Sequence, residues 1–248
     1  MPIEFTATPQ YATLPTGNTF SGKVLLETKN EGKKDALDVV CCMDGSGSMN
    51  GLPLAALKGF LKNLFDNGIP GVTLRLRLLA FGDHARVIAM DDEAFGLDQL
   101  PADPLKQLNE TTKASFHALL DSVGAQEGQT NISESIDLAL KLLRKQEVVD
   151  RSHSVAAPRV KHIVVLTDGL ANRGETDGAK LLERDGERII DTKEDYFVHF
   201  IGLGDGAPEN FFMKACDEGK RGIVSFCPAA VVSVWCVGSM DSDFPPGV

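Results

Sequence analysis

The chain has 248 residues, with a hydrophobic fraction of 43% and a charged fraction of 24%, values typical of an ordinary soluble globular protein. Its formal net charge of −10 argues against a general nucleic-acid binder or a binder of anionic membranes, because both need a basic surface. No apolar stretch reaches the length of a bilayer span, and the first ten residues lack the basic and apolar regions of a secretory signal. The sequence therefore predicts neither a membrane segment nor a signal peptide.

The first 34 residues differ from the rest, because Thr, Pro and Gly interrupt two short strand candidates at 3–7 and 20–28. From residue 35 onward, apolar runs typical of buried strands alternate with segments of helical periodicity. The predicted strands are 36–43, 73–81, 86–90, 161–167, 196–203 and 223–226. The predicted helices are 54–64, part of 114–123, 132–146, 179–191 and one that begins within 208–215.

The five cysteines include two neighbours, Cys41 and Cys42, inside the apolar run 39–43. Adjacent residues of a strand point to opposite faces of a sheet, so these two thiols are poorly placed to form a disulfide. We therefore expect reduced cysteines and a cytoplasmic protein.

A hairpin is predicted where the alternating segment 73–81 meets 86–90 across Gly82-Asp83-His84. We expect it at the edge of the sheet, because Arg75 and Arg77 would need one face in contact with water.

The strongest helical pattern, 132–146, follows Asn131, and Glu134 stands three residues after that asparagine. This spacing predicts a capping box at the start of the helix. The polar stretch 147–159 that follows is predicted to be a surface loop.

Strands alternating with helices at this spacing predict an α/β fold with a doubly wound, mostly parallel sheet, one antiparallel edge strand and helices on both faces. We expect this domain to span 35–228. Residues 1–34 are predicted to form an N-terminal β extension, and 229–248 a C-terminal strand and tail that pairs with it.

Polar side chains follow two of the predicted parallel strands, at the edge where ligands bind in such sheets. Asp44-Gly45-Ser46-Gly47-Ser48 follows the first strand, and Thr167-Asp168-Gly169 ends the strand at 161–167. The loop Gly128-Gln129-Thr130-Asn131 precedes a helix and so lies at the same edge. Carboxylate and hydroxyl oxygens without nearby His or Cys fit Mg²⁺, Mn²⁺ or Ca²⁺ better than zinc.

These motifs, D-x-S-x-S, then G-x-T-N, then T-D-G, resemble the metal-ion-dependent adhesion site (MIDAS) of the von Willebrand factor type A (VWA) family, over roughly residues 35–227. The resemblance implies a Rossmann-like VWA fold. It also implies that Ser46 and Ser48 bind the metal directly and that Thr130 binds it directly or through water. Asp44 and Asp168 would act mainly through bridging waters or hydrogen bonds to the serines.

A metal ion with neutral hydroxyl ligands stays electrophilic and keeps a replaceable water. An Asp or Glu of a partner protein would complete its coordination. We therefore expect a non-enzymatic, adhesion-like protein-interaction domain that depends on a divalent metal, with Arg173 available for a second partner carboxylate. The residues expected to surround the metal and contact the partner are Met49, Asn50, Gln129, Asn131, Leu170, Asn172, Arg173 and Asp205.

Two alternative functions use the same residues. One is a metal-dependent hydrolase or phosphatase, and the other is a docking subunit of an ATPase or chelatase-like complex. The glycine-rich segment 202–207 fits a dinucleotide-binding fingerprint, but that fingerprint belongs on a first strand and here the chain is nearly finished. We interpret this segment as a turn.

Overall fold

The computed structural model of this chain describes residues 36–69, 71–89, 96–126, 128–153, 159–184, 187–188, 196–203, 209–219 and 224–227. The predicted terminal β segments, 1–34 and 229–248, lie outside these residues, and so does Asp205.

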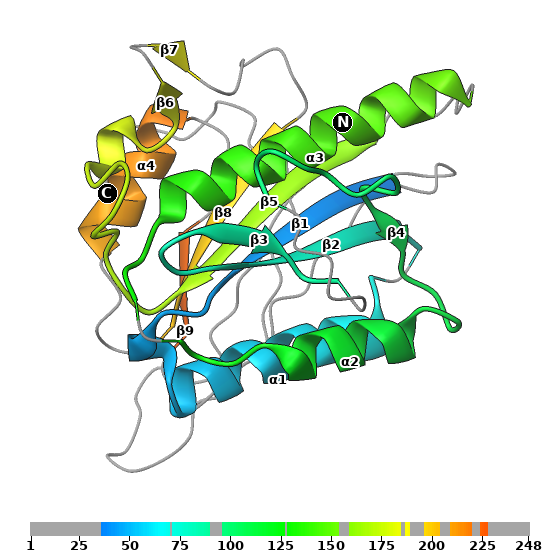
Figure 1. Ribbon diagram of the computed structural model, residues 1–248, viewed down its shortest axis with the longest axis horizontal. Helices are drawn as coiled ribbons and strands as arrows, with labels where there is room; N and C mark the ends of the chain where they lie inside the picture. The colour runs from blue at the N-terminus through cyan, green and yellow to red at the C-terminus, as the bar shows by residue number, and fades with distance from the viewer. Residues whose placement is uncertain are drawn as a thin grey trace, which may run out of the picture.

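The fold is built around a seven-stranded sheet (Figure 1). Its strands are β1 (Ala36–Asp44), β2 (Thr73–Phe81), β3 (Ala85–Val87), β4 (Lys106–Gln107), β5 (Val160–Thr167), β8 (Tyr196–Leu203) and β9 (Val224–Cys227). The order is β3-β2-β1-β5-β8-β9, and β4 also pairs with β2. β3 and β4 run antiparallel to β2, whereas the other pairs are parallel. This arrangement confirms the predicted mostly parallel sheet and the hairpin at its edge.

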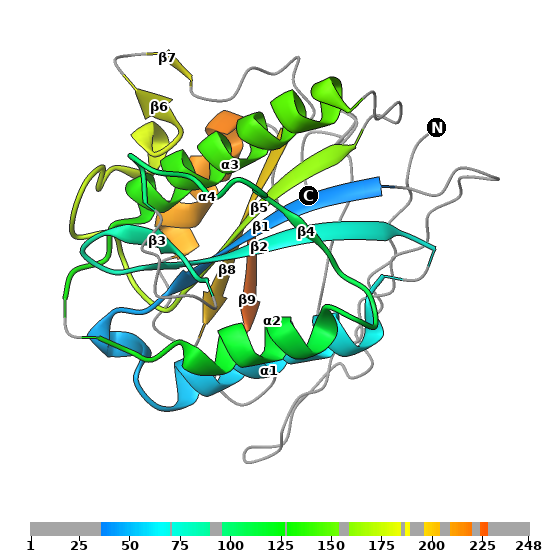
Figure 2. The same cartoon turned by 45° about the vertical axis from the view of Figure 1, so that its right-hand side comes forward.

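Two pairs of helices cover the two faces of the sheet, as Figures 1 and 2 show. α1 (Leu52–Asn67) and α2 (Lys113–Ser122) lie on one face. α3 (Ile132–Ser152) and α4 (Glu209–Gly219) lie on the other. Within the described part of the chain, no helix combines the length and hydrophobicity that a membrane span requires.

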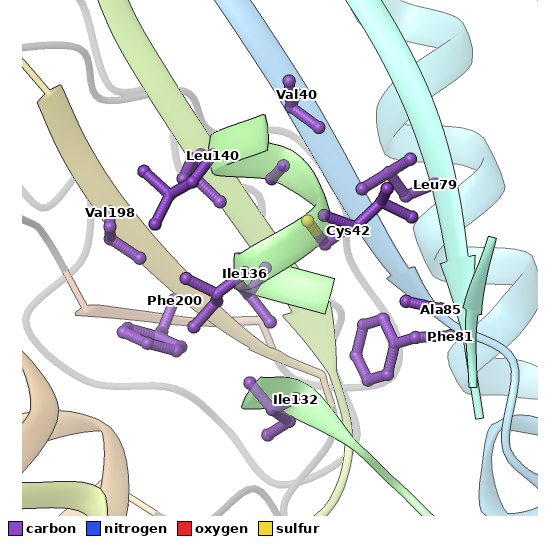
Figure 3. Packing of buried hydrophobic residues seen from close by; sticks show 14 of the residues in the cluster. Val40, Cys42, Leu79, Phe81, Ala85, Ile132, Ile136, Leu140, Val198 and Phe200 are labelled. Atoms are coloured by element: carbon purple, nitrogen blue, oxygen red, sulfur yellow. The ribbon is translucent and has the colours of Figure 1, made fainter. Parts of the chain in front are cut away.

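The central strand β1 is buried on both faces, because its successive side chains enter two different cores. Cys41 belongs to the core that includes Leu61 of α1. Val40 and Cys42 belong to the opposite core, which includes Ile136 of α3 (Figure 3). Cys41 and Cys42 are both free thiols. This packing explains the uninterrupted apolar run that precedes Asp44.

The prediction that Arg75 and Arg77 need a wet face is wrong. Arg77 is buried and donates hydrogen bonds to the backbone carbonyls of Asp103 and Pro104, the latter at 2.7 Å. Arg75 donates to the carboxylates of Asp38 and Asp150. A guanidinium has five donors, so it tolerates burial where several acceptors surround it.

Two other segments differ from the predictions. α3 continues through Ser152, so the first part of the predicted loop 147–159 is helical. The predicted helix at 179–191 is instead a short 3-10 helix, η2 (Gly178–Lys180), followed by a two-stranded hairpin of β6 (Glu183–Arg184) and β7 (Glu187–Arg188).

Candidate metal centre

Asp44 is the last residue of β1 and is fully buried. One oxygen of its carboxylate, Oδ1, accepts a hydrogen bond from the Ser46 backbone N–H at 2.8 Å, and Oδ2 accepts one from the Thr167 hydroxyl. Burial raises the pKa of the Asp44 carboxyl, although the hydrogen bonds from Thr167 and Ser46 oppose this rise. Asp44 therefore joins the ends of β1 and β5 and fixes the turn that carries the two serines.

The two serines and Asp168 form a continuous line of oxygen atoms. Ser46 Oγ lies 3.1 Å from Ser48 Oγ, and Ser48 Oγ donates a hydrogen bond of 2.8 Å to Asp168 Oδ1. Ser46 is buried, whereas Ser48 is exposed. The line thus runs from beneath the surface to the solvent, between the carboxyl ends of two neighbouring strands.

Thr130 approaches the same edge from the loop before α3 and is 4% exposed. Its backbone N–H donates to Asn172 Oδ1 at 2.7 Å, and its carbonyl accepts from the Asn172 N–H at 3.1 Å. The next residue, Asn131, donates its backbone N–H to the Gly82 carbonyl at 3.0 Å. The loop with Thr130 therefore lies between the β2–β3 turn and the loop that follows Asp168.

Two residues expected to face a partner point into the protein instead. Met49 is completely buried, because the 3-10 helix η1 (Gly47–Met49) turns it into the core beneath α1. Asn131 is also buried and caps α3: its Oδ1 accepts from the Glu134 N–H at 3.3 Å, and its Nδ2 donates to Glu134 Oε2 at 2.8 Å. The predicted N-cap is confirmed, but the reciprocal bond of a capping box is not formed, because Glu134 accepts from the Asn131 side chain and the Asn131 backbone N–H donates to Gly82.

Four of the other expected rim residues, Asn50, Gln129, Leu170 and Asn172, are exposed. Arg173 is partly exposed, and its guanidinium already has partners within the protein. Its guanidinium lies 3.6 Å from Asp83 Oδ1 and 3.5 Å from His84 Nε2, over the β2–β3 turn.

The β2–β3 turn supplies side chains that the sequence reasoning did not assign to the site. Asp83 Oδ1 also accepts from the Gln129 backbone N–H at 2.7 Å, and His84 Nδ1 lies 3.4 Å from Glu134 Oε2. The position of this turn, at the edge where the metal-site motifs lie, is the signal that could have identified them.

The donor chemistry of this edge fits a hard divalent cation. No group of three or more His, Cys, Asp or Glu side chains gathers around one point in the described residues. An ion at this edge would therefore depend on hydroxyl oxygens in addition to carboxylates, which suits Mg²⁺, Mn²⁺ or Ca²⁺. The residues that could hold it are Asp44, Ser46, Ser48, Thr130 and Asp168.

In a comparison with known families, the model of the von Willebrand factor type A domain matches residues 38–226. No curated protein is similar enough to match the chain.

Similar solved structures include a von Willebrand factor type A protein from Catenulispora acidiphila, with a TM-score of 0.57 and 18% identity over 78% of this chain and 39% of that one. The conserved hypothetical protein BatB from Bacteroides thetaiotaomicron has a TM-score of 0.52 and 17% identity over 77% of this chain and 90% of that one. Proximal thread matrix protein 1 from the mussel byssus, in a structure with a zinc-occupied MIDAS motif, has a TM-score of 0.46 and 20% identity over 77% and 41%. At these identities the first two show the fold, and the chain spans about two fifths of the first.

Proposed function

Because the chain belongs to the von Willebrand factor type A family, whose domains generally mediate protein–protein interactions, we propose that it binds a partner protein through a divalent metal ion. The side chains that would hold the ion are Asp44, Ser46, Ser48, Thr130 and Asp168. The ion would be Mg²⁺, Mn²⁺ or Ca²⁺, and the partner would contribute an Asp or Glu.

The observation that carries this proposal is the line of oxygens from Ser46 through Ser48 to Asp168. Both hydroxyls keep lone pairs that can be directed at a cation, because a hydroxyl oxygen accepts as well as donates. Asp168 accepts from Ser48, and Asp44 holds the serine turn through the Ser46 N–H. The two carboxylates thus orient the ligands and supply negative charge nearby.

An ion held in this way would supply Lewis acidity at the surface. Since the serine and threonine hydroxyls are neutral, they leave much of the positive charge unbalanced on the solvent side. A carboxylate of a partner is the ligand that best supplies the missing charge. The exposed residues around the ion, Asn50, Gln129, Leu170 and Asn172, would lie at the contact together with Arg173.

The direct test measures divalent-ion binding by isothermal titration calorimetry for the wild type and for Ser48→Ala. We expect millimolar or tighter binding that the substitution removes, with an unchanged circular dichroism spectrum. Ser152→Ala is the matched control, because Ser152 is an exposed serine at the far end of α3 whose hydroxyl donates to the Val149 carbonyl. Equal affinity in the wild type and Ser48→Ala would contradict the assignment.

A second experiment addresses the partner. Proteins captured by the wild type in Mg²⁺ should be released by EDTA and should not be captured by Ser48→Ala. If the purified protein instead hydrolyses a phosphoester with Mg²⁺ and Ser48→Ala removes that activity, the hydrolase alternative replaces this proposal.

A further inference from the structure

Thr130 and Asn172 are joined by two hydrogen bonds that run in opposite directions. The Thr130 N–H donates to Asn172 Oδ1 at 2.7 Å, and the Asn172 N–H donates to the Thr130 carbonyl at 3.1 Å. Two bonds to the same residue restrict both the distance and the rotation of the Thr130 backbone. Thr130 is buried and Asn172 is exposed, so the asparagine holds the threonine from the solvent side.

The segments that contain these residues are joined at further points. The Glu175 N–H donates to Ser133 Oγ at 3.1 Å, and Ser133 Oγ donates to Asn131 Oδ1 at 3.0 Å. Gly174 packs closely against the segment that contains Asn131 and Ser133. A Cβ at position 174 would stand 2.3 Å from Ser133 Oγ and 2.4 Å from Asn131 Oδ1. We name the two joined segments, 130–133 and 172–175, the clasp.

The clasp connects Thr130 to the rest of the candidate metal centre. Asn172 follows Asp168 by four residues, and Asp168 accepts the hydrogen bond from Ser48. Thr130 itself lies in a loop between α2 and α3, where no strand pairing fixes it. The backbone N–H groups of its neighbours, Gln129 and Asn131, are bonded to the β2–β3 turn, and the clasp is what holds Thr130 to the segment that follows Asp168.

We propose that Asn172 is a positioning residue that holds Thr130 for the metal ion, an inference that rests on the proposed function. The sequence predicted Asn172 as a partner contact. Its side-chain carbonyl also accepts a hydrogen bond from the Thr130 N–H, which gives it a further role inside the site. Groups that orient metal ligands typically change metal affinity about 10- to 100-fold when they are removed.

The test compares Mg²⁺ and Mn²⁺ affinities of the wild type, Asn172→Leu and Asn172→Asp by calorimetry. We expect Asn172→Leu to weaken binding about 10-fold or more. Asn172→Asp should bind at least as well as the wild type, because it keeps the acceptor oxygen. Asn63→Leu, the same substitution at an exposed position of α1, is the control and should bind as the wild type does.

A double-mutant cycle shows whether Asn172 acts through Thr130. In the Thr130→Ala background, Asn172→Leu should change the metal affinity by less than about twofold. The threonine ligand that Asn172 positions is already absent there, so the two losses do not add. An equal loss in both backgrounds, or no loss in Asn172→Leu alone, overturns the inference.

Hydrogen exchange gives a readout that needs no metal. The Thr130 amide should exchange faster in Asn172→Leu than in the wild type and Asn172→Asp, because its acceptor is gone. Unchanged exchange of this amide also overturns the inference. A wild-type protein that binds no divalent ion overturns the proposed function and the positioning role with it, whereas retained affinity in Asn172→Leu overturns the positioning role alone.

Discussion

Asp38 is buried and forms an ion pair with the partly buried Arg75 near the start of β1, at the end of the strand opposite Asp44. Arg75 Nη2 lies 2.6 Å from Asp38 Oδ2, and Nε donates to Asp38 Oδ1 at 2.8 Å. Arg159 Nε donates a hydrogen bond of 2.6 Å to the same carboxylate. Asp150, near the end of α3, accepts hydrogen bonds from Nη1 and Nη2 of Arg75. One network thus ties β1, β2, α3 and the segment before β5 together.

The first prediction is that Asp38→Asn destabilises the protein by about 3 kcal/mol, because it leaves two partly buried arginines, Arg75 and Arg159, without full charge compensation. Metal affinity should not change, since five residues of β1 separate Asp38 from Asp44. Urea denaturation and calorimetry measure the two quantities. Asp66→Asn is the matched control: Asp66 is exposed and pairs with His117, so its loss should cost less than about 1 kcal/mol. A similar small effect of Asp38→Asn would contradict the role of the network.

The network also shows why the sequence predicted only part of the fold. Buried strands such as β1 and β5 were predictable because apolar runs mark them directly. The last turns of α3 were not, because their polar residues are used inside the protein: Glu147 accepts from the Tyr196 hydroxyl, and Asp150 accepts from Arg75. The spacing of apolar residues along the sequence does not distinguish polar residues that are bonded inside the protein from polar residues that contact water.

The segment at 179–191 was mispredicted for a related reason. Its apolar residues suggested a helix, but Gly178 lies so close to α4 that a Cβ there would stand 2.3 Å from the Phe211 carbonyl oxygen. This contact joins residues far apart in the chain, and a local pattern does not contain it. At the candidate metal centre, similarly, the motifs placed residues on loops but did not give the direction of each side chain, as Met49 shows.

The second prediction concerns pH. His162 Nδ1 and His199 Nε2 lie 2.8 Å apart in a buried pair, and the outer nitrogen of each ring has no hydrogen-bond partner among the described residues. Burial lowers the pKa of His199 to about 4, and burial together with His199 lowers the pKa of His162 well below its usual value.

The unfolded chain binds protons at these rings near pH 6.5, whereas the folded protein does not. The unfolded state therefore binds more protons below this pH, and the free energy of unfolding should fall as the pH decreases from about 6.5 toward about 4. Each histidine adds up to about 1.4 kcal/mol per pH unit to that slope. Urea denaturation at several pH values measures it.

A double variant, His162→Phe with His199→Phe, should reduce this slope while keeping rings that can stack with Phe197. His153→Gln, at an exposed histidine, serves as the control and should leave the slope as it is. An unchanged slope in the double variant would show that the pair does not cause the pH dependence.

The third prediction is that Cys41 and Cys42 resist thiol reagents in the native protein. Burial raises the pKa of Cys41 to about 12 and also raises that of Cys42, so the reactive thiolate is scarce at neutral pH. Alkylation followed by peptide mapping should label both residues in urea and neither in buffer within the same time. Rapid native labelling, or a disulfide at either position, would contradict their place in β1.

The last prediction separates two glycines by what surrounds them. Gly174 has a φ of +69°, and a Cβ there would collide with Ser133 Oγ and Asn131 Oδ1. Gly174→Ala should therefore open the clasp and destabilise the protein by about 1 to 3 kcal/mol. Under the proposed function it should also weaken Mg²⁺ binding, because Thr130 would lose its fixed position.

Gly59 offers the opposite case, since it lies within α1 and a Cβ there would have no atom within 4 Å. Gly59→Ala should stabilise the protein by about 0.5 to 1 kcal/mol, because alanine has the higher helix propensity, and it should leave Mg²⁺ affinity unchanged. Thermal unfolding and calorimetry on both variants give the comparison. If Gly174→Ala instead behaves as Gly59→Ala does, the close approach of 172–175 to 130–133 is not what holds Thr130 at the edge of the sheet.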